Sequence, residues 1–212
     1  MIADFVYVLI GAENSALPSV NFKPPRVSWL KFMAQNVEIK ASLSEQEFAD
    51  LRKRVCEITS IDCVLEQTDT FFNAPRDRLK LREFTDGTAE LIAYSRNDQS
   101  DAKLSDYVRT STAQPQRLKD SLERSIGIRG VVTKRRELYL IEQTRIHLDE
   151  VEGLGKFVEL EVVLSDQQSH EFGRQIADEL VVKLGIKPES FISCAYIDLL
   201  EDALVQNGNL SS

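Results

Sequence analysis

Charged side chains recur at every second residue in several segments of this chain. Arg145, His147 and Asp149 alternate with apolar residues, and so do Glu159 and Glu161. Residues two apart in an extended strand point to the same face, so each segment would present a row of ionic groups. Such rows could hold an anion and a metal ion, because guanidinium groups match pairs of phosphate oxygens and carboxylate oxygens are ligands that Mg²⁺ prefers. Similar rows are Arg78, Lys80 and Arg82; Lys134 and Arg136; Glu38 and Lys40.

The alternation does not by itself decide which face of a strand lines an interior. A sheet with a solvated outer face gives the same pattern, and on periodicity alone that interpretation is the commoner one. The two histidines, His147 and His170, are too far apart to suggest a His-based metal cluster. Cys56, Cys63 and Cys194 have neither metal-ligand nor disulfide-framework spacing, so reduced thiols are expected.

The elements that would carry these rows are predicted by periodicity and by turn residues. Eight segments are expected to be strands: 35–43, 64–73, 78–84, 89–96, 104–110, 131–141, 144–151 and 157–164. Helices are predicted at 115–126, at 168–184 and at 45–57, where Ser44-Glu45-Gln46-Glu47 is a capping box. Asp86-Gly87 suits a hairpin turn between two of the strands. Eight strands suit a closed barrel, since closure removes exposed edges.

Composition limits the class of protein. The chain has 212 residues, enough for one ordinary domain, and 42% hydrophobic with 28% charged residues is typical of a globular fold. A net charge of -8 disfavours nucleic acid or an anionic membrane as a partner. The apolar run from Phe5 to Ile10 is too short to span a bilayer and lacks the preceding basic residues of a secretory signal. We therefore expect a cytoplasmic protein with a poorly ordered extension at 1–32, a domain at 33–204 and a tail at 205–212.

Four segments resemble, in order and spacing, the CYTH family, named for class IV adenylyl cyclases and thiamine triphosphatases. They are Val37-Glu38-Ile39-Lys40, Arg78-Leu79-Lys80-Leu81-Arg82, Thr144-Arg145-Ile146-His147-Leu148-Asp149 and Phe157-Val158-Glu159-Leu160-Glu161. The resemblance covers about residues 34–202 and ends with Tyr196 and Asp198-Leu199-Leu200. It implies an α+β fold, an eight-stranded antiparallel closed β-barrel called the triphosphate tunnel, with an ionic interior and helices packed on the outside.

The resemblance also implies roles for the ionic residues. The cations expected to hold a triphosphate are Lys40, Arg78, Lys80, Arg82, Arg96, Lys134, Arg136 and Arg145. The carboxylates expected to hold Mg²⁺ or Mn²⁺ are Glu38, Asp149, Glu159 and Glu161, and the expected catalytic group is Glu38, Lys40, Glu159 and Glu161. The first strand departs from the family pattern Glu-x-Glu-x-Lys, because Asn36 occupies its first acidic position. A neutral amide there weakens one metal ligand.

The expected function is metal-dependent hydrolysis of a triphosphate compound: inorganic tripolyphosphate, thiamine triphosphate or a nucleoside triphosphate. Two alternatives stay open. One is a class IV-type adenylyl cyclase that converts ATP to cyclic AMP and pyrophosphate. The other is a non-catalytic module that binds triphosphate or polyphosphate, which the neutral Asn36 would explain. The expected partner is a triphosphate-containing small molecule, and neither a nucleic acid nor a membrane is expected.

Overall fold

The strands and helices lie within a few residues of the predicted positions. A computed structural model describes residues 34–96, 103–206 and 208, so the extension predicted at 1–32 is outside the described residues. The strands are β1 (Ala34–Leu43), β2 (Ile61–Phe72), β3 (Arg78–Phe84), β4 (Ala89–Arg96), β5 (Lys103–Thr112), β6 (Ile128–Ile141), β7 (Thr144–Val151) and β8 (Gly155–Leu164). The helices are α1 (Glu45–Ile58), α2 (Pro115–Ile126), α3 (His170–Leu184) and α4 (Tyr196–Gln206). The sequence patterns considered above do not predict α4.

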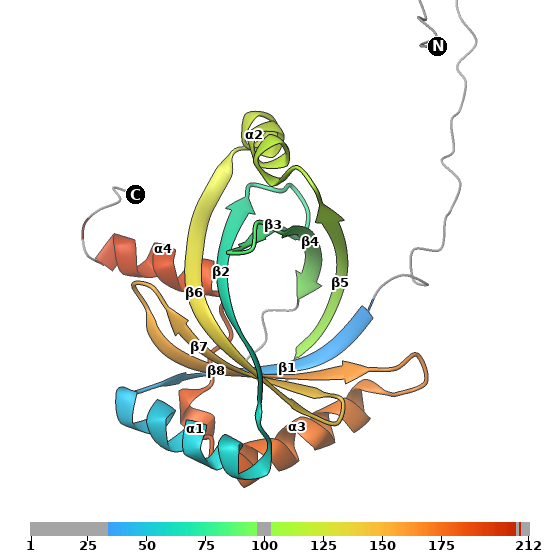
Figure 1. Cartoon of the computed structure of the whole chain (residues 1–212), viewed down its shortest axis with the longest axis vertical. Helices are drawn as coiled ribbons and strands as arrows, with labels where there is room; N and C mark the ends of the chain where they lie inside the picture. Colours follow the sequence, from blue (N-terminus) through green and yellow to red (C-terminus); the bar gives the residue numbers. More distant parts are fainter. Residues whose placement is uncertain (1–33, 97–102, 207, 209–212) are drawn as a thin grey trace, which may run out of the picture.

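The eight strands form one closed antiparallel barrel (Figure 1). Their order around the ring is β1-β5-β4-β3-β2-β6-β7-β8, and β1 pairs with both β5 and β8. The ring of paired strands is therefore complete, which removes the exposed edges of an open meander. The predicted fold class is confirmed.

Local sequence signals account for the ends of several elements. The Ser44 hydroxyl accepts a hydrogen bond from the backbone of Glu47, and the Glu47 carboxylate accepts one from the backbone of Ser44, so the capping box of α1 is present. In the hairpin between β3 and β4, Gly87 has a φ of 83°, a value that residues with a Cβ rarely adopt. Gly185 ends α3 in the left-handed conformation.

Helices cover the apolar outer faces of the barrel. In Figure 1, α1 and α3 lie side by side beneath the sheet. They bury Val37, Ile39, Leu160 and Val162 of β1 and β8 in one core. At Gly173 of α3 a Cβ would come within 2.8 Å of the Val37 side chain, so only glycine allows this close approach. Because alternate residues face opposite ways, covering these apolar residues turns their ionic neighbours inward.

The other two helices pack on different parts of the barrel: α2 covers part of the outer surface, and the start of α4 packs against strand residues that face the interior. Leu118 and Leu122 of α2 pack on a small core that includes Leu81 of β3. Ile197 of α4 packs with Phe71 and Val132 of β2 and β6. Within residues 34–96 and 103–206, no helix is both long enough and apolar enough to cross a membrane.

Candidate active site

The barrel encloses a cavity of about 380 Å³, lined by residues from all eight strands and from the start of α4. Its cations are Lys40, Lys80, Arg82, Arg109, Lys134, Arg136 and Arg145. Its carboxylates are Glu38, Asp69, Glu90, Glu159 and Glu161. Cations thus outnumber carboxylates here, although the whole chain has a net charge of -8. The cavity is suited to an anion.

Most of the cations that were predicted to hold a triphosphate come together in this cavity. Lys40, Lys80, Arg82, Lys134, Arg136 and Arg145 all line it. Arg78 is not among the lining residues of the described structure, and its guanidinium donates to Asp198 Oδ2 of α4 at 3.1 Å. The side chain of Arg96 is outside the described part of the structure. Arg78 therefore lies at the contact between β3 and α4, where it holds the helix.

Asp69 of β2, which the sequence patterns did not single out, contacts three of these cations. Lys80 Nζ and Lys134 Nζ lie 2.8 and 2.9 Å from Asp69 Oδ2, and Arg82 donates from Nε and Nη2 at 2.7 Å each. Burial alone would raise the pKa of Asp69, but the charges of Arg82, Lys134 and Lys80 outweigh burial and hold that pKa well below its usual range. The sequence signal that could have identified Asp69 is its place in the alternation Gln67, Asp69, Phe71, where an acidic residue shares a face with its neighbours two positions away.

The two lysines beside Asp69 have depressed pKa values. Burial lowers the pKa of Lys134 to about 7, while the charge of Asp69 opposes that shift. Burial and then the charge of Arg82 lower the pKa of Lys80 to about 8, again against the effect of Asp69. Both lysines consequently change charge near neutral pH.

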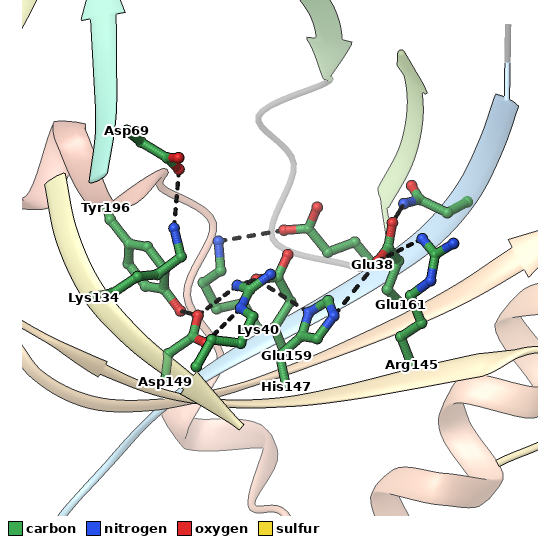
Figure 2. A network of polar contacts seen from close by, with 12 residues as sticks. Glu38, Lys40, Asp69, Lys134, Arg145, His147, Asp149, Glu159, Glu161 and Tyr196 are labelled. Atoms are coloured by element: carbon green, nitrogen blue, oxygen red, sulfur yellow. Dashed lines mark hydrogen bonds and ion pairs between the residues drawn. The ribbon is translucent and has the colours of Figure 1, made fainter. Parts of the chain in front are cut away.

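Arg136 is held by a second buried carboxylate, Asp149 of β7. Arg136 donates to Asp149 from Nε at 2.6 Å and from Nη2 at 2.5 Å, and to Glu159 at 2.8 Å. The Tyr196 hydroxyl donates to Asp149 Oδ2 at 2.8 Å (Figure 2). Asp149 was predicted to be a metal ligand, but it is fully buried and is not among the residues that line the cavity. Its contacts hold Arg136 and Tyr196 in place.

The three glutamates that were predicted to bind metal lie on the adjacent strands β1 and β8. The strand register places Glu38 opposite Glu161 and Lys40 opposite Glu159. Lys40 Nζ lies 3.4 Å from Glu38, and Arg145 Nη1 lies 3.3 Å from Glu161. Arg136 contacts Glu159, so each of the three glutamates has a cation beside it.

Asn36 and His147 lie beside Glu38, Glu159 and Glu161, and together these residues form an acidic wall of the cavity. The Asn36 side chain donates to Glu161, while its Oδ1 is buried and has no hydrogen-bond partner among the described residues. His147 stands between Glu159 and Glu161, with its ring nitrogens 3.9 and 3.8 Å from their carboxylates (Figure 2). Burial, and then the charge of Arg136, lower the pKa of His147 to about 4, so the imidazole is neutral at physiological pH.

The donor chemistry of this wall fits a hard divalent cation. In the described chain, no three or more His, Cys, Asp or Glu side chains are placed as a ready metal cluster. The glutamates instead contact Lys40, Arg136 and Arg145. Carboxylate oxygens, with the unpartnered Oδ1 of Asn36 beside them, are nevertheless the ligand type that Mg²⁺ and Mn²⁺ take.

Aromatic and apolar side chains line the rest of the cavity. The Lys40 ammonium lies 4.4 Å from the centre of the Tyr196 ring, and Lys80 lies 5.4 Å from the Phe71 ring. These rings stabilise buried positive charge through their quadrupoles. Residues that the sequence patterns missed on this lining include Leu65, Phe84, Glu90, Ile92, Tyr94, Tyr107, Arg109 and Leu138.

Comparison with known proteins agrees with this architecture. Adenylate cyclase CyaB of Aeromonas hydrophila is 30% identical over 89 residues, which are 41% of this chain and 47% of that protein, so the match spans about half of the relative. The PH1012 protein of Pyrococcus horikoshii OT3 superposes with a TM-score of 0.70 at 24% identity, over 77% of this chain and 98% of that one. HpAC1 from Hippeastrum superposes with a TM-score of 0.57 at 16% identity, over 84% and 98%. The CYTH domain model matches residues 34–196, and the chain belongs to the CYTH family.

Proposed function

We propose that this protein is a metal-dependent hydrolase of a triphosphate compound. The observation that carries the proposal is the convergence of six buried or half-buried cations on one cavity that also presents the three glutamates predicted to bind metal; the cations are Lys40, Lys80, Arg82, Lys134, Arg136 and Arg145. A triphosphate carries several negative charges, and a cluster of like charges needs such a counter-ion. HpAC1 from Hippeastrum, which shares the fold, has a dominant triphosphatase activity.

The side chains of the cavity divide into two functions. Arg82 and Arg136 are held by Asp69 and Asp149 before any ligand arrives, so little side-chain freedom is lost when they bind phosphate oxygens. Glu38, Glu159 and Glu161, with Asn36 Oδ1, would hold a divalent cation, which when bound polarises a phosphoryl oxygen. One of these glutamates would also orient the attacking water. The products would be a diphosphate and orthophosphate.

A second candidate function is adenylyl cyclase activity, which is favoured by the match to adenylate cyclase CyaB. The same cations would then orient ATP so that its ribose 3′-hydroxyl attacks the α-phosphorus and pyrophosphate leaves. The reaction product separates this candidate from hydrolysis. A third candidate function is a non-catalytic module that binds triphosphate, because Asn36 replaces one acidic ligand of the acidic wall.

The deciding experiment measures orthophosphate release from tripolyphosphate, thiamine triphosphate and ATP, each with Mg²⁺ and with Mn²⁺, with cyclic AMP measured in parallel. Orthophosphate release that chelation and Arg82→Ala abolish, and that Arg135→Ala preserves, supports hydrolysis. Arg135 is a suitable control because it lies on the outer face of β6 and contacts Glu66, Glu137 and Glu150. Cyclic AMP with pyrophosphate would support the cyclase, and binding without either product would support the binding module.

A further inference from the structure

Asp69 has an unusual position for a carboxylate, since it lies inside a cavity that is suited to anions. Its side chain is 2% exposed, and that of Lys134 beside it is 1% exposed. Arg82 contacts both carboxylate oxygens, and two lysine ammonium groups contact Oδ2. All three cations therefore have one common partner.

The physical consequence of this arrangement concerns both geometry and charge. Three cations so close together repel one another, and in a buried site a lysine can relieve repulsion by releasing its proton. The bidentate contact with Asp69 sets the plane of the Arg82 guanidinium. The charge of Asp69 also raises the pKa of Lys80 and of Lys134, against the lowering by burial.

We propose that Asp69 is a positioning residue for triphosphate binding: its carboxylate holds Lys80, Arg82 and Lys134 together and favours the charged form of both lysines, without itself touching the substrate. This inference rests on the proposed function, because it takes the ligand to be a triphosphate. Direct contact between Asp69 and a phosphate group is unfavourable, since both are anionic. Asp69 acts through the cations that it holds.

A carboxylate in an anion site also neutralises part of the positive charge, and this effect by itself would weaken triphosphate binding. The charges around the lysines limit this effect. Lys134 has two carboxylates around it, Asp69 of β2 and Asp149 of β7. It also has three cations around it: Lys80 and Arg82 of β3, and Arg136 of its own strand. Lys80 faces Asp69, Arg82 and Arg136, together with the Phe71 and Tyr94 rings. Removing the charge of Asp69 would leave these lysines mainly among cations, so they would lose protons and the cavity would gain little positive charge.

The test is calorimetric titration of the full chain with tripolyphosphate in EDTA, comparing wild type, Asp69→Asn and Asp69→Glu. We expect Asp69→Asn to raise the dissociation constant about tenfold at about pH 8.5 and less at about pH 6.5, where the lysines regain their protons. Asp69→Glu restores the charge and should recover part of the affinity.

Glu137→Gln is the matched control. Glu137 is buried like Asp69 and contacts Arg52, Arg135 and Tyr139, but it does not line the cavity. It should lose stability and keep wild-type affinity for tripolyphosphate. If Asp69→Asn does not fold, Asp69→Glu is measured together with an NMR titration of the lysine side chains.

Three results would overturn the inference. The first is binding of tripolyphosphate by Asp69→Asn that is as tight as that of the wild type, or tighter. The second is a loss of affinity in Asp69→Asn that is the same at both pH values and that Glu137→Gln shows as well. The third is a titration in which Lys80 and Lys134 of the wild type show ordinary lysine pKa values. A wild type that binds no tripolyphosphate would instead overturn the proposed function, and this inference with it.

Discussion

The Tyr196 hydroxyl donates a hydrogen bond to Asp149 Oδ2 at 2.8 Å, which joins α4 to the barrel strand β7. Asp149 in turn accepts two hydrogen bonds from Arg136, and the Tyr196 ring lies under the Lys40 ammonium. A helix near the end of the described chain thus holds two of the residues that are proposed to bind triphosphate.

Tyr196→Phe should weaken this link without removing the ring. The variant loses one hydrogen bond to a buried carboxylate, so the free energy of unfolding should fall by about 1.5–3 kcal/mol, and tripolyphosphate affinity should fall several-fold because Arg136 is less well held. Thermal unfolding and calorimetric titration measure the two effects. Tyr139→Phe is the control, since Tyr139 donates to the buried Glu137 outside the cavity. Equal effects of both variants on affinity would contradict the prediction.

Glu159→Gln should impair metal binding more than triphosphate binding. The change keeps the size of the side chain but removes a negative ligand, so turnover should fall about 100-fold, by comparison with losses of single electrostatic groups in other enzymes. Mn²⁺ titration, tripolyphosphate titration in EDTA and phosphate release measure the three quantities. Unchanged Mn²⁺ affinity would remove Glu159 from the metal site.

Arg82→Ala should have the reverse effect. Losing the guanidinium group should raise the dissociation constant for tripolyphosphate by at least about tenfold, while Mn²⁺ affinity changes little, because the proposed metal ligands lie on β1 and β8. Asp69 keeps Lys80 and Lys134 as partners in this variant. Arg135→Ala on the outer face is the matched control, and a similar loss of affinity there would indicate a general effect of charge.

Asn36→Glu restores the acidic residue of the family pattern and should make stability depend on metal. Asn36 now donates to Glu161, and a second carboxylate in its place would repel Glu161 when no metal is bound. The melting temperature should therefore fall in EDTA and rise in Mn²⁺ by more than that of the wild type. Faster turnover would show that the wild type lacks this ligand. A variant that is indifferent to Mn²⁺ would argue against a metal site on this wall.

Tripolyphosphate binding should be accompanied by proton uptake near pH 8. In the free protein the pKa values of Lys134 and Lys80 are about 7 and about 8, so both are partly deprotonated there. A bound polyanion favours the charged lysines, so affinity should decrease as pH rises through this range. Titration in buffers with different ionisation enthalpies counts the protons. Lys134→Met should reduce the uptake, and an unchanged count would show that Lys134 is not the source.

The sequence by itself determined the elements that rely on neighbouring residues. Alternation of apolar and ionic side chains marks the eight strands, and the capping box at Ser44 marks the start of α1, because both depend on contacts within a few residues. Periodicity could not tell inside from outside: Leu160 and Glu161 alternate in the same way whichever of them is covered. The family resemblance made that choice, and the packing of α1 and α3 on the outer face gives the physical reason.

Only the tertiary structure decided which ionic residues meet. Arg78 belongs to the same row as Lys80 and Arg82, yet Asp198, 120 positions along the chain, draws it to α4. Asp69 and Lys134 are 65 positions apart, and they meet because β2 and β6 are neighbours in the ring. Such contacts depend on strand order and on the docking of α4, which no local pattern encodes, so the sequence indicated most of the cavity's cations but not Asp69, which holds three of them.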